Sequence, residues 1–273
     1  MWVFPARTID EAVTKMAPGG LALAGGTVLG PKIIRGEYER TTFVDIRRID
    51  SLKQLNLSDN CIDIGAGVTL SQLIANRRSA GLDRALNDAA AAVGNPHVRN
   101  IATVAGNLTS GLAGADLPTA LLALGAEVSH KGADGEQRQP VAQILQNGLP
   151  GGRLITSILI PRDGLRVSGF AKFAWRRASG ITIVNVALSL RTVEGHIAAP
   201  GLAVGGPGHH AVRLPRAESI LLGRAWDKDL VEEVAQAAAT EVVFTTAHSS
   251  REQYRRRLVA AGVRQILTQM VPS

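Results

Sequence analysis

The 273-residue sequence has only one cysteine, Cys61, and lacks any run of about 18 consecutive apolar residues. A single cysteine excludes an internal disulfide, and it cannot supply the ligands of an iron–sulfur cluster or of a cysteine-rich zinc site. We therefore expect any such cluster to belong to a partner chain. The first residues also lack the charged region, apolar stretch and small-residue cleavage site of a leader peptide. These features predict a cytoplasmic protein with no membrane span.

Aromatic residues are also scarce, at 4% of the sequence, although the net charge of +7 raises the possibility of nucleic-acid binding. The basic residues are scattered as short groups such as Arg47-Arg48, Arg176-Arg177 and Arg255-Arg256-Arg257. With so few aromatic rings, platforms on which bases could stack are rare. The sequence therefore favours a protein that does not bind nucleic acid.

Several motifs of catalysis and nucleotide binding are missing. Gly65-Ala66-Gly67 is not completed by a third glycine at the spacing of a Rossmann turn, and no P-loop element occurs. The serine elbow of hydrolases and the paired-histidine helix of zinc proteases are absent as well. His209-His210 has no acidic neighbour, so we interpret the pair as part of a loop rather than as a metal site.

The apolar pattern predicts an α/β part before a boundary near residue 165 and an α+β part after it. Helices are expected over Thr8 to Met16, Ser71 to Ala80, Leu82 to Val93 and Glu252 to Met270, with a hairpin over Glu127 to Val141. Strands are expected at Leu21 to Ala24, Thr42 to Ile46, Cys61 to Ile64, Leu154 to Ile160, Ile181 to Thr192 and Gly201 to Val204. The segment from Gly94 to Gly114 lacks periodicity, and its length inside a compact domain indicates a functional loop. Asp116 is placed to cap the helix that follows it.

Two glycine turns are candidates for binding a phosphate group. Gly25-Gly26-Thr27 ends the first apolar strand, and Gly106-Asn107 lies inside the long irregular segment. Glycine lets consecutive backbone N–H groups point at an anion without a bulky cation. Ordinary turns use the same residues, so a purely structural role stays open for both.

Longer stretches resemble one family. They are Ala24 to Leu29, Val44-Asp45-Ile46, Ile64 to Leu70, Gly94 to Leu108, Asp116-Leu117-Pro118, Ala123 to Val128, Ile155 to Pro161, Lys172 to Arg177, Val212 to Glu218 and Ser250 to Arg256. Together they are similar to the FAD-binding medium subunit of the xanthine dehydrogenase and carbon monoxide dehydrogenase family of molybdenum hydroxylases. The resemblance covers nearly the whole chain.

The resemblance implies an α+β fold of the vanillyl-alcohol-oxidase-like (PCMH) type. It consists of an FAD-binding domain at 1–165, with lobes 1–56 and 57–165, and a C-terminal domain at 166–273 with a three-stranded sheet and helices. The implied cofactor is noncovalent FAD, and the residues implied to hold it are Ala22, Leu23, Ala24, Gly25, Gly26, Thr27, Val28, Leu29, Thr103, Val104, Gly106, Asn107, Thr109, Asp116, Ile155 and Lys172. No residue is assigned to acid–base catalysis or to a metal.

By the same resemblance, the chain passes electrons from a partner's [2Fe-2S] cluster through FAD to an external acceptor. The implied partners are a small iron–sulfur subunit and a large molybdopterin subunit, assembled as a dimer of heterotrimers. The alternatives are a free-standing flavin oxidoreductase with its own substrate and a binding module without active flavin. The sequence departs from the family at Ala105, where a glycine is usual, and at Ser179-Gly180, where an acidic residue is common. The extra methyl of Ala105 is tolerable only if that backbone position has a negative φ.

Overall fold

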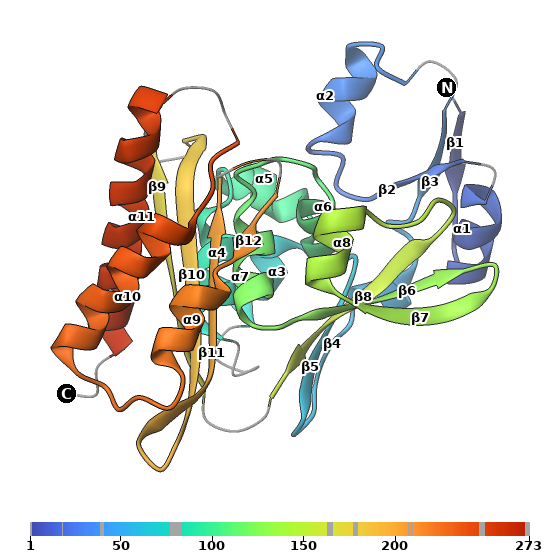
Figure 1. Cartoon of the computed structure of the whole chain (residues 1–273). Coiled ribbons are helices and arrows are strands. Elements are labelled where there is room, and N and C mark those ends of the chain that lie inside the picture. Colours follow the sequence, from blue (N-terminus) through green and yellow to red (C-terminus); the bar gives the residue numbers. More distant parts are fainter. Residues whose placement is uncertain are drawn as a thin grey trace.

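The computed structural model describes residues 2–17, 19–38, 41–76, 83–162, 166–176, 180–206, 208, 210–245 and 249–270. Three sheets organise this part of the chain, each covered by helices (Figure 1). The predicted α+β fold of the PCMH type is confirmed, and the sheets follow one another along the sequence.

The first sheet is parallel and has the order β1-β3-β2. Its strands are β1 (Trp2–Pro5), β2 (Leu21–Leu23) and β3 (Thr42–Asp45). The connection from β1 to β2 contains α1 (Ile9–Met16), where Thr8 caps the helix by accepting a hydrogen bond from the Glu11 amide. Next, α2 (Leu29–Ile34) follows the glycine turn and projects from the edge of the sheet (Figure 1). None of the α2 residues is buried.

The second sheet has five strands in the order β4-β5-β8-β6-β7, with all neighbours antiparallel. The strands are β4 (Leu55–Leu57), β5 (Cys61–Gly65), β6 (Glu127–Gly132), β7 (Gly135–Pro140) and β8 (Leu154–Pro161). The helices are η1 (Asp50–Lys53), α3 (Leu70–Ala75), α4 (Arg84–Ala92), α5 (Pro96–Ile101), α6 (Val104–Leu108), α7 (Asp116–Ala123) and α8 (Val141–Asn147). A capping box between Thr69 and Gln72 starts α3.

The third sheet is antiparallel, in the order β12-β11-β10-β9. Its strands are β9 (Arg166–Ala174), β10 (Thr182–Val193), β11 (His196–Gly205) and β12 (Val212–Arg213). The helices that follow are α9 (Pro215–Leu221), α10 (Lys228–Glu241) and α11 (Ser249–Met270). The three long strands match the expected three-stranded sheet, and the two-residue β12 adds a short edge.

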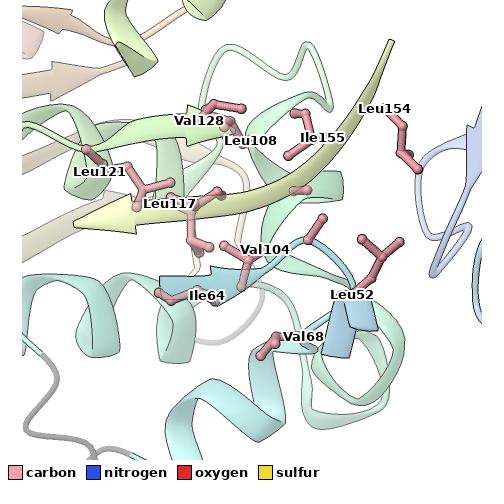
Figure 2. Packing of buried hydrophobic residues seen from close by; sticks show 14 of the residues in the cluster. Leu52, Ile64, Val68, Val104, Leu108, Leu117, Leu121, Val128, Leu154 and Ile155 are labelled. Carbon is pink, nitrogen blue, oxygen red and sulfur yellow. The ribbon is translucent and has the colours of Figure 1, made fainter. Parts of the chain in front are cut away.

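Two large clusters of buried apolar side chains stabilise the molecule. One joins the first two sheets and includes Leu52, Ile64, Val104, Leu117 and Ile155 (Figure 2). The other lies between the third sheet and the helices α9 to α11. A smaller cluster made mostly of alanines, among them Ala85, Ala120, Ala187 and Ala203, lies where α4 and α7 pack on the third sheet. Small side chains let α7 approach that sheet closely.

Several local predictions were wrong. The segment from Gly94 to Gly114 is not irregular throughout, because it contains α5 and α6. The N-cap position of α7 is Ala115, and no side chain caps the helix; the Asp116 carboxylate instead binds Lys172 and Asn185. The strand β9 was not expected. Residues 77–80 and 82 of two predicted helices lie outside the described residues, as do Arg177, Ser179 and His209.

Candidate functional site

A cavity of 630 Å³ lies between the first sheet, α6, the segment before β8 and one loop of the C-terminal part. This volume is within the range of about 300 to 1,000 Å³ that is typical of cofactor sites. Its wall consists of residues 20–22 and 24–29, Lys32, Tyr38, residues 102–103, 105–106, 108–113, 115 and 118, residues 144–145 and 148–155, and His210 and Ala211, together with Met16, Ile46 and Ala66.

The first glycine turn brings two segments of backbone into close contact. A Cβ on Gly25 would lie 1.9 Å from the Ile101 carbonyl oxygen, so the position has no room for a side chain. Gly26 has a φ of +67°, which glycine adopts without strain. Within the described part of the chain, no hydrogen bond uses the N–H of Gly25, Gly26, Thr27 or Val28. These donors are therefore available to a ligand in the cavity.

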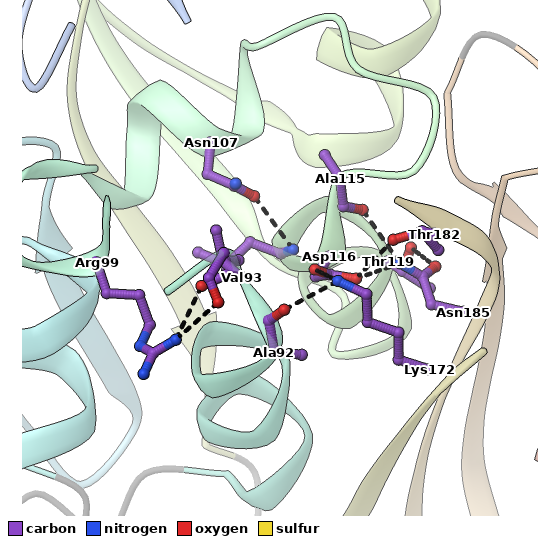
Figure 3. A network of polar contacts seen from close by, with 12 residues as sticks. Ala92, Val93, Arg99, Asn107, Ala115, Asp116, Thr119, Lys172, Thr182 and Asn185 are labelled. Carbon is purple, nitrogen blue, oxygen red and sulfur yellow. Dashed lines mark hydrogen bonds and ion pairs between the residues drawn. The ribbon is translucent and has the colours of Figure 1, made fainter. Parts of the chain in front are cut away.

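The second turn is organised differently. Thr103 caps α6 by accepting a hydrogen bond from the Gly106 amide at 3.1 Å, so this amide is already satisfied. Asn107 does not face the cavity, and its Oδ1 accepts a hydrogen bond from the Leu117 amide at 3.2 Å (Figure 3). Ala105 lies within α6 and is not among the residues with positive φ, so its methyl group is accommodated.

A third wall leads into the start of β8, and of its residues the sequence suggested only Ile155. Residues 148–155 line the cavity, and Gly148 and Gly152 have φ values of +74° and +75°. Arg153 anchors this wall to the β6–β7 hairpin: its Nε donates to His130 Nδ1 at 2.7 Å, and it also binds Asp134 and the Gly135 carbonyl. Burial lowers the pKa of His130, and the charge of Arg153 acts in the same direction. The run of glycine and proline over 148–152 was the available signal.

The charges around the cavity favour an anionic ligand. In the described lining, the charged side chains are those of Lys32 and Arg153, of which Arg153 is already paired with Asp134, and no carboxylate is among them. Together with the free amides of the first turn, this arrangement suits a pyrophosphate group. Most of the remaining wall is apolar, which suits the planar rings of a dinucleotide.

Asp116 and Lys172 form a buried ion pair next to the cavity rather than in its wall. Lys172 Nζ lies 2.6 Å from Asp116 Oδ2 and 2.9 Å from the Ala92 carbonyl oxygen at the end of α4 (Figure 3). Asn185 Nδ2 donates to Asp116 Oδ1 at 2.8 Å. The network therefore joins α4 and α7 to strands β9 and β10.

The cavity accounts for most of the residues that the sequence suggested. Those that line it are Ala22, Ala24, Gly25, Gly26, Thr27, Val28, Leu29, Thr103, Gly106, Thr109 and Ile155. Those that do not are Leu23, Val104, Asn107, Asp116 and Lys172. Lining residues that the sequence did not suggest include Lys32, Tyr38, residues 110–113, residues 148–153 and His210.

The described residues contain neither a candidate metal site nor a candidate membrane span. Among these residues, no three His, Cys, Asp or Glu side chains are grouped so that they could hold a metal ion. No helix of the described part has both the length and the apolar character needed to cross a membrane.

Comparison with known proteins identifies the fold and the family. Residues 2–163 match the family described as the FAD binding domain in molybdopterin dehydrogenase, and residues 170–270 match the CO dehydrogenase flavoprotein C-terminal domain. The chain is 30% identical to the 6-hydroxypseudooxynicotine dehydrogenase complex subunit alpha of Paenarthrobacter nicotinovorans, over 96% of this chain and 91% of that one. It is 26% identical to the nicotinate dehydrogenase FAD-subunit of Eubacterium barkeri, over 84% and 82% of the two chains.

Solved structures show the same fold. Carbon monoxide dehydrogenase from Oligotropha carboxidovorans superposes with a TM-score of 0.89 at 21% identity, and quinoline 2-oxidoreductase from Pseudomonas putida 86 with 0.88 at 21%. Both alignments cover 98% of this chain and 96% of the other. Fold and cavity thus define an FAD-binding flavoprotein of the PCMH type. The chain belongs to the family of FAD-binding medium subunits of molybdenum hydroxylases, which confirms the resemblance seen in the sequence.

Proposed function

We propose that this chain holds one noncovalent FAD in the 630 Å³ cavity and serves as the electron-transfer subunit of a molybdenum hydroxylase. The observation that carries the proposal is the first glycine turn: its residues line the cavity, and within the described part of the chain its backbone amides make no hydrogen bond, while the described lining contains Lys32 and no carboxylate. Such a site neutralises a pyrophosphate group without a metal ion.

The residues fall into two groups under this proposal. Residues 24–29 bind the pyrophosphate and ribityl part, with Thr103, Gly106 and Thr109 on the opposite wall and Ile155 against a ring. The residues behind the wall hold it in place; they are Val104, Asn107, Asp116 and Lys172. The side chain of Leu23 lies next to Gly26 and supports the turn. This division assigns direct contact with FAD to the lining residues only.

FAD supplies the redox chemistry, since a bound flavin accepts electrons one at a time and passes them on as a pair. The chain positions and shields the cofactor and supplies no acid–base group of its own. With a single cysteine it cannot ligate an iron–sulfur cluster, which normally takes four protein ligands. We therefore propose a small [2Fe-2S] subunit and a large molybdopterin subunit as partners, in a dimer of heterotrimers.

The proposal includes a division into an FAD-binding domain at 1–165 and a C-terminal domain at 166–273. The separate buried cluster of the C-terminal part supports this division. A cytoplasmic location for the assembled enzyme belongs to the same proposal, and cell fractionation would test it.

Acid denaturation of the purified chain tests the cofactor. The expected result is release of one FAD per chain into the supernatant, identified by chromatography against FMN and riboflavin. Release of FMN alone, or colour that stays with the precipitated protein, would overturn noncovalent FAD binding. Turnover of a small molecule by the yellow chain without partners would favour the free-standing oxidoreductase instead.

A further inference from the structure

Asn185 on β10 is fully buried, and both the Nδ2 and the Oδ1 of its side-chain amide have hydrogen-bond partners. Its Nδ2 donates to Asp116 Oδ1 at 2.8 Å and lies 3.4 Å from the carbonyl oxygen of Ala115. Its Oδ1 accepts a hydrogen bond from the Thr119 hydroxyl at 2.7 Å (Figure 3). These contacts fix the orientation of the amide, because the Thr119 hydroxyl donates to its oxygen and the Asp116 carboxylate accepts from its nitrogen.

The segment that Asn185 holds is a wall of the cavity. Residues 109–113 and Ala115, which precede Asp116 in the sequence, line the cavity, and so does Pro118, which follows it. The same segment is attached to the C-terminal part at two more points. The Gly206 amide donates to the Ala113 carbonyl at 2.9 Å, and a Cβ on Gly114 would lie 2.7 Å from the Thr182 Cβ. Two of these residues reach the buried charge: Asn185 Nδ2 at 2.8 Å and, less closely, the Thr182 hydroxyl at 3.5 Å from Asp116 Oδ1.

The surroundings allow little besides a neutral amide at position 185. Lys172 already balances the charge of Asp116, so the second carboxylate oxygen needs a neutral donor. The space is also closed, because a Cβ on Gly205 would lie 2.1 Å from Asn185 Oδ1 and 2.4 Å from Thr119 Oγ1. A carboxylate at this position would put a second negative charge within hydrogen-bond distance of Asp116.

We propose that Asn185 is a positioning residue of the FAD site: it touches no part of the cavity, but it holds the 109–115 wall in the shape that FAD requires by fixing Asp116 and Ala115. This inference rests on the proposed function. It assigns the C-terminal sheet a part in shaping the flavin site.

The test compares Asn185→Asp with the wild type in FAD titrations of the full chain at pH 5 and pH 8. A protonated Asp at this position donates to Asp116 as the amide does, whereas an ionised one repels it. The groups facing position 185 are the charged Asp116 and Lys172 and the neutral Thr119 and Thr182. Two carboxyl groups this close share a proton, and the loss of that proton is what releases the wall.

The expected result for N185D is an affinity within about threefold of the wild type at pH 5 and a loss of about tenfold or more at pH 8. Asn185→Leu cannot donate at any pH, so it should weaken FAD binding by about 5- to 150-fold at both. Thr119→Val frees the amide to rotate and should weaken FAD severalfold, with recovery in Thr119→Ser. These Thr119 variants keep the proposal testable if N185D does not fold at pH 8.

The matched control is Ser189→Ala, which removes another buried polar group of β10 four residues further along the same strand. It should lower the melting temperature without changing FAD affinity or its pH profile. A wild-type chain that binds no FAD would overturn the proposed function, and this inference with it. A wild type that binds FAD, combined with N185D and T119V affinities equal to its own at both pH values, would overturn the inference alone.

Discussion

Gly25 is the residue at which a single methyl group should have the clearest effect. In Gly25→Ala the new Cβ would lie 1.9 Å from the Ile101 carbonyl oxygen, so the two segments must separate. We expect a destabilisation of about 1 to 3 kcal/mol, as in other overpacked sites, together with loss of bound FAD. Thermal unfolding and flavin absorbance measure the two effects. Gly30→Ala is the control, since a Cβ there meets nothing within 4 Å; an equal loss of FAD in both variants would contradict this account.

Gly26 allows the contribution of charge to be separated from that of backbone strain. Its φ of +67° is costly for most residues, but asparagine and aspartate tolerate it comparably. Gly26→Asn therefore serves as the reference for Gly26→Asp, which adds a carboxylate beside the pyrophosphate. We expect the Asp variant to bind FAD more weakly than the Asn variant by about 1 to 4 kcal/mol, the Coulomb energy at about 4 Å. Equal affinities in calorimetric titration would show that the pyrophosphate lies elsewhere.

At the scale of residues, the sequence predicts local chemistry better than distant contacts. The turn at Gly25-Gly26 follows directly from a strand that ends in two glycines, and the structure places it at the cavity. Asp116 also had the pattern of a helix cap, yet its carboxylate binds Lys172 and Asn185, which lie 56 and 69 residues away in the sequence. No local pattern contains those partners, so the capping prediction was wrong.

Among the elements, the β6–β7 hairpin carries a pH-sensitive link to the cavity wall. His130 accepts a hydrogen bond from Arg153 through Nδ1, which requires the neutral ring. Burial lowers its pKa below the ordinary value of 6.5, so as the pH falls below that value the unfolded chain takes up a proton that the folded chain does not. The free energy of unfolding should therefore decrease between pH 7 and pH 5, by at most about 2 kcal/mol for a single histidine.

The variant His130→Asn isolates this contribution. Its Oδ1 can still accept from Arg153, but it does not titrate, so the decrease between pH 7 and pH 5 should shrink even though the smaller side chain lowers stability overall. Urea denaturation at the two pH values gives the slope. A slope identical to that of the wild type would mean that another group is responsible.

Elements with strong periodicity or clear turns were predictable from the sequence, and short ones were not. Helix α1 and the hairpin of β6 and β7 matched their predictions closely. Helices α5 and α6 have only six and five residues, too few to show a helical period, so their segment was predicted as irregular. The wall at 148–152 has no periodicity either, and its glycines acquire a function only where the fold brings them to the cavity.

For the whole molecule, the family assignment supports the proposed assembly, because the relatives are named as subunits of larger enzymes. The resemblance found in the sequence is confirmed over both parts of the chain, because each part matches a domain of the same flavoprotein family. Residue types and their spacing alone predicted only the two candidate phosphate-binding turns. Composition could not predict the remaining lining residues, since the cavity is formed by segments from the beginning, middle and C-terminal part of the sequence.

The last prediction concerns that assembly. Purified alone, the chain should contain FAD but neither iron nor molybdenum and should show no hydroxylase activity, because one cysteine cannot ligate a [2Fe-2S] cluster. Co-expressed with a cluster-bearing small subunit and a molybdopterin-bearing large subunit, it should co-elute with both in size-exclusion chromatography, and its flavin absorbance should bleach when a hydroxylase substrate is added. A Gly25→Ala chain in the same complex separates assembly from electron transfer. It should still co-elute with both partners, but no flavin absorbance should remain to bleach when substrate is added. If the wild-type chain elutes alone and its flavin stays oxidised in the mixture, it does not act as the relay of such a complex.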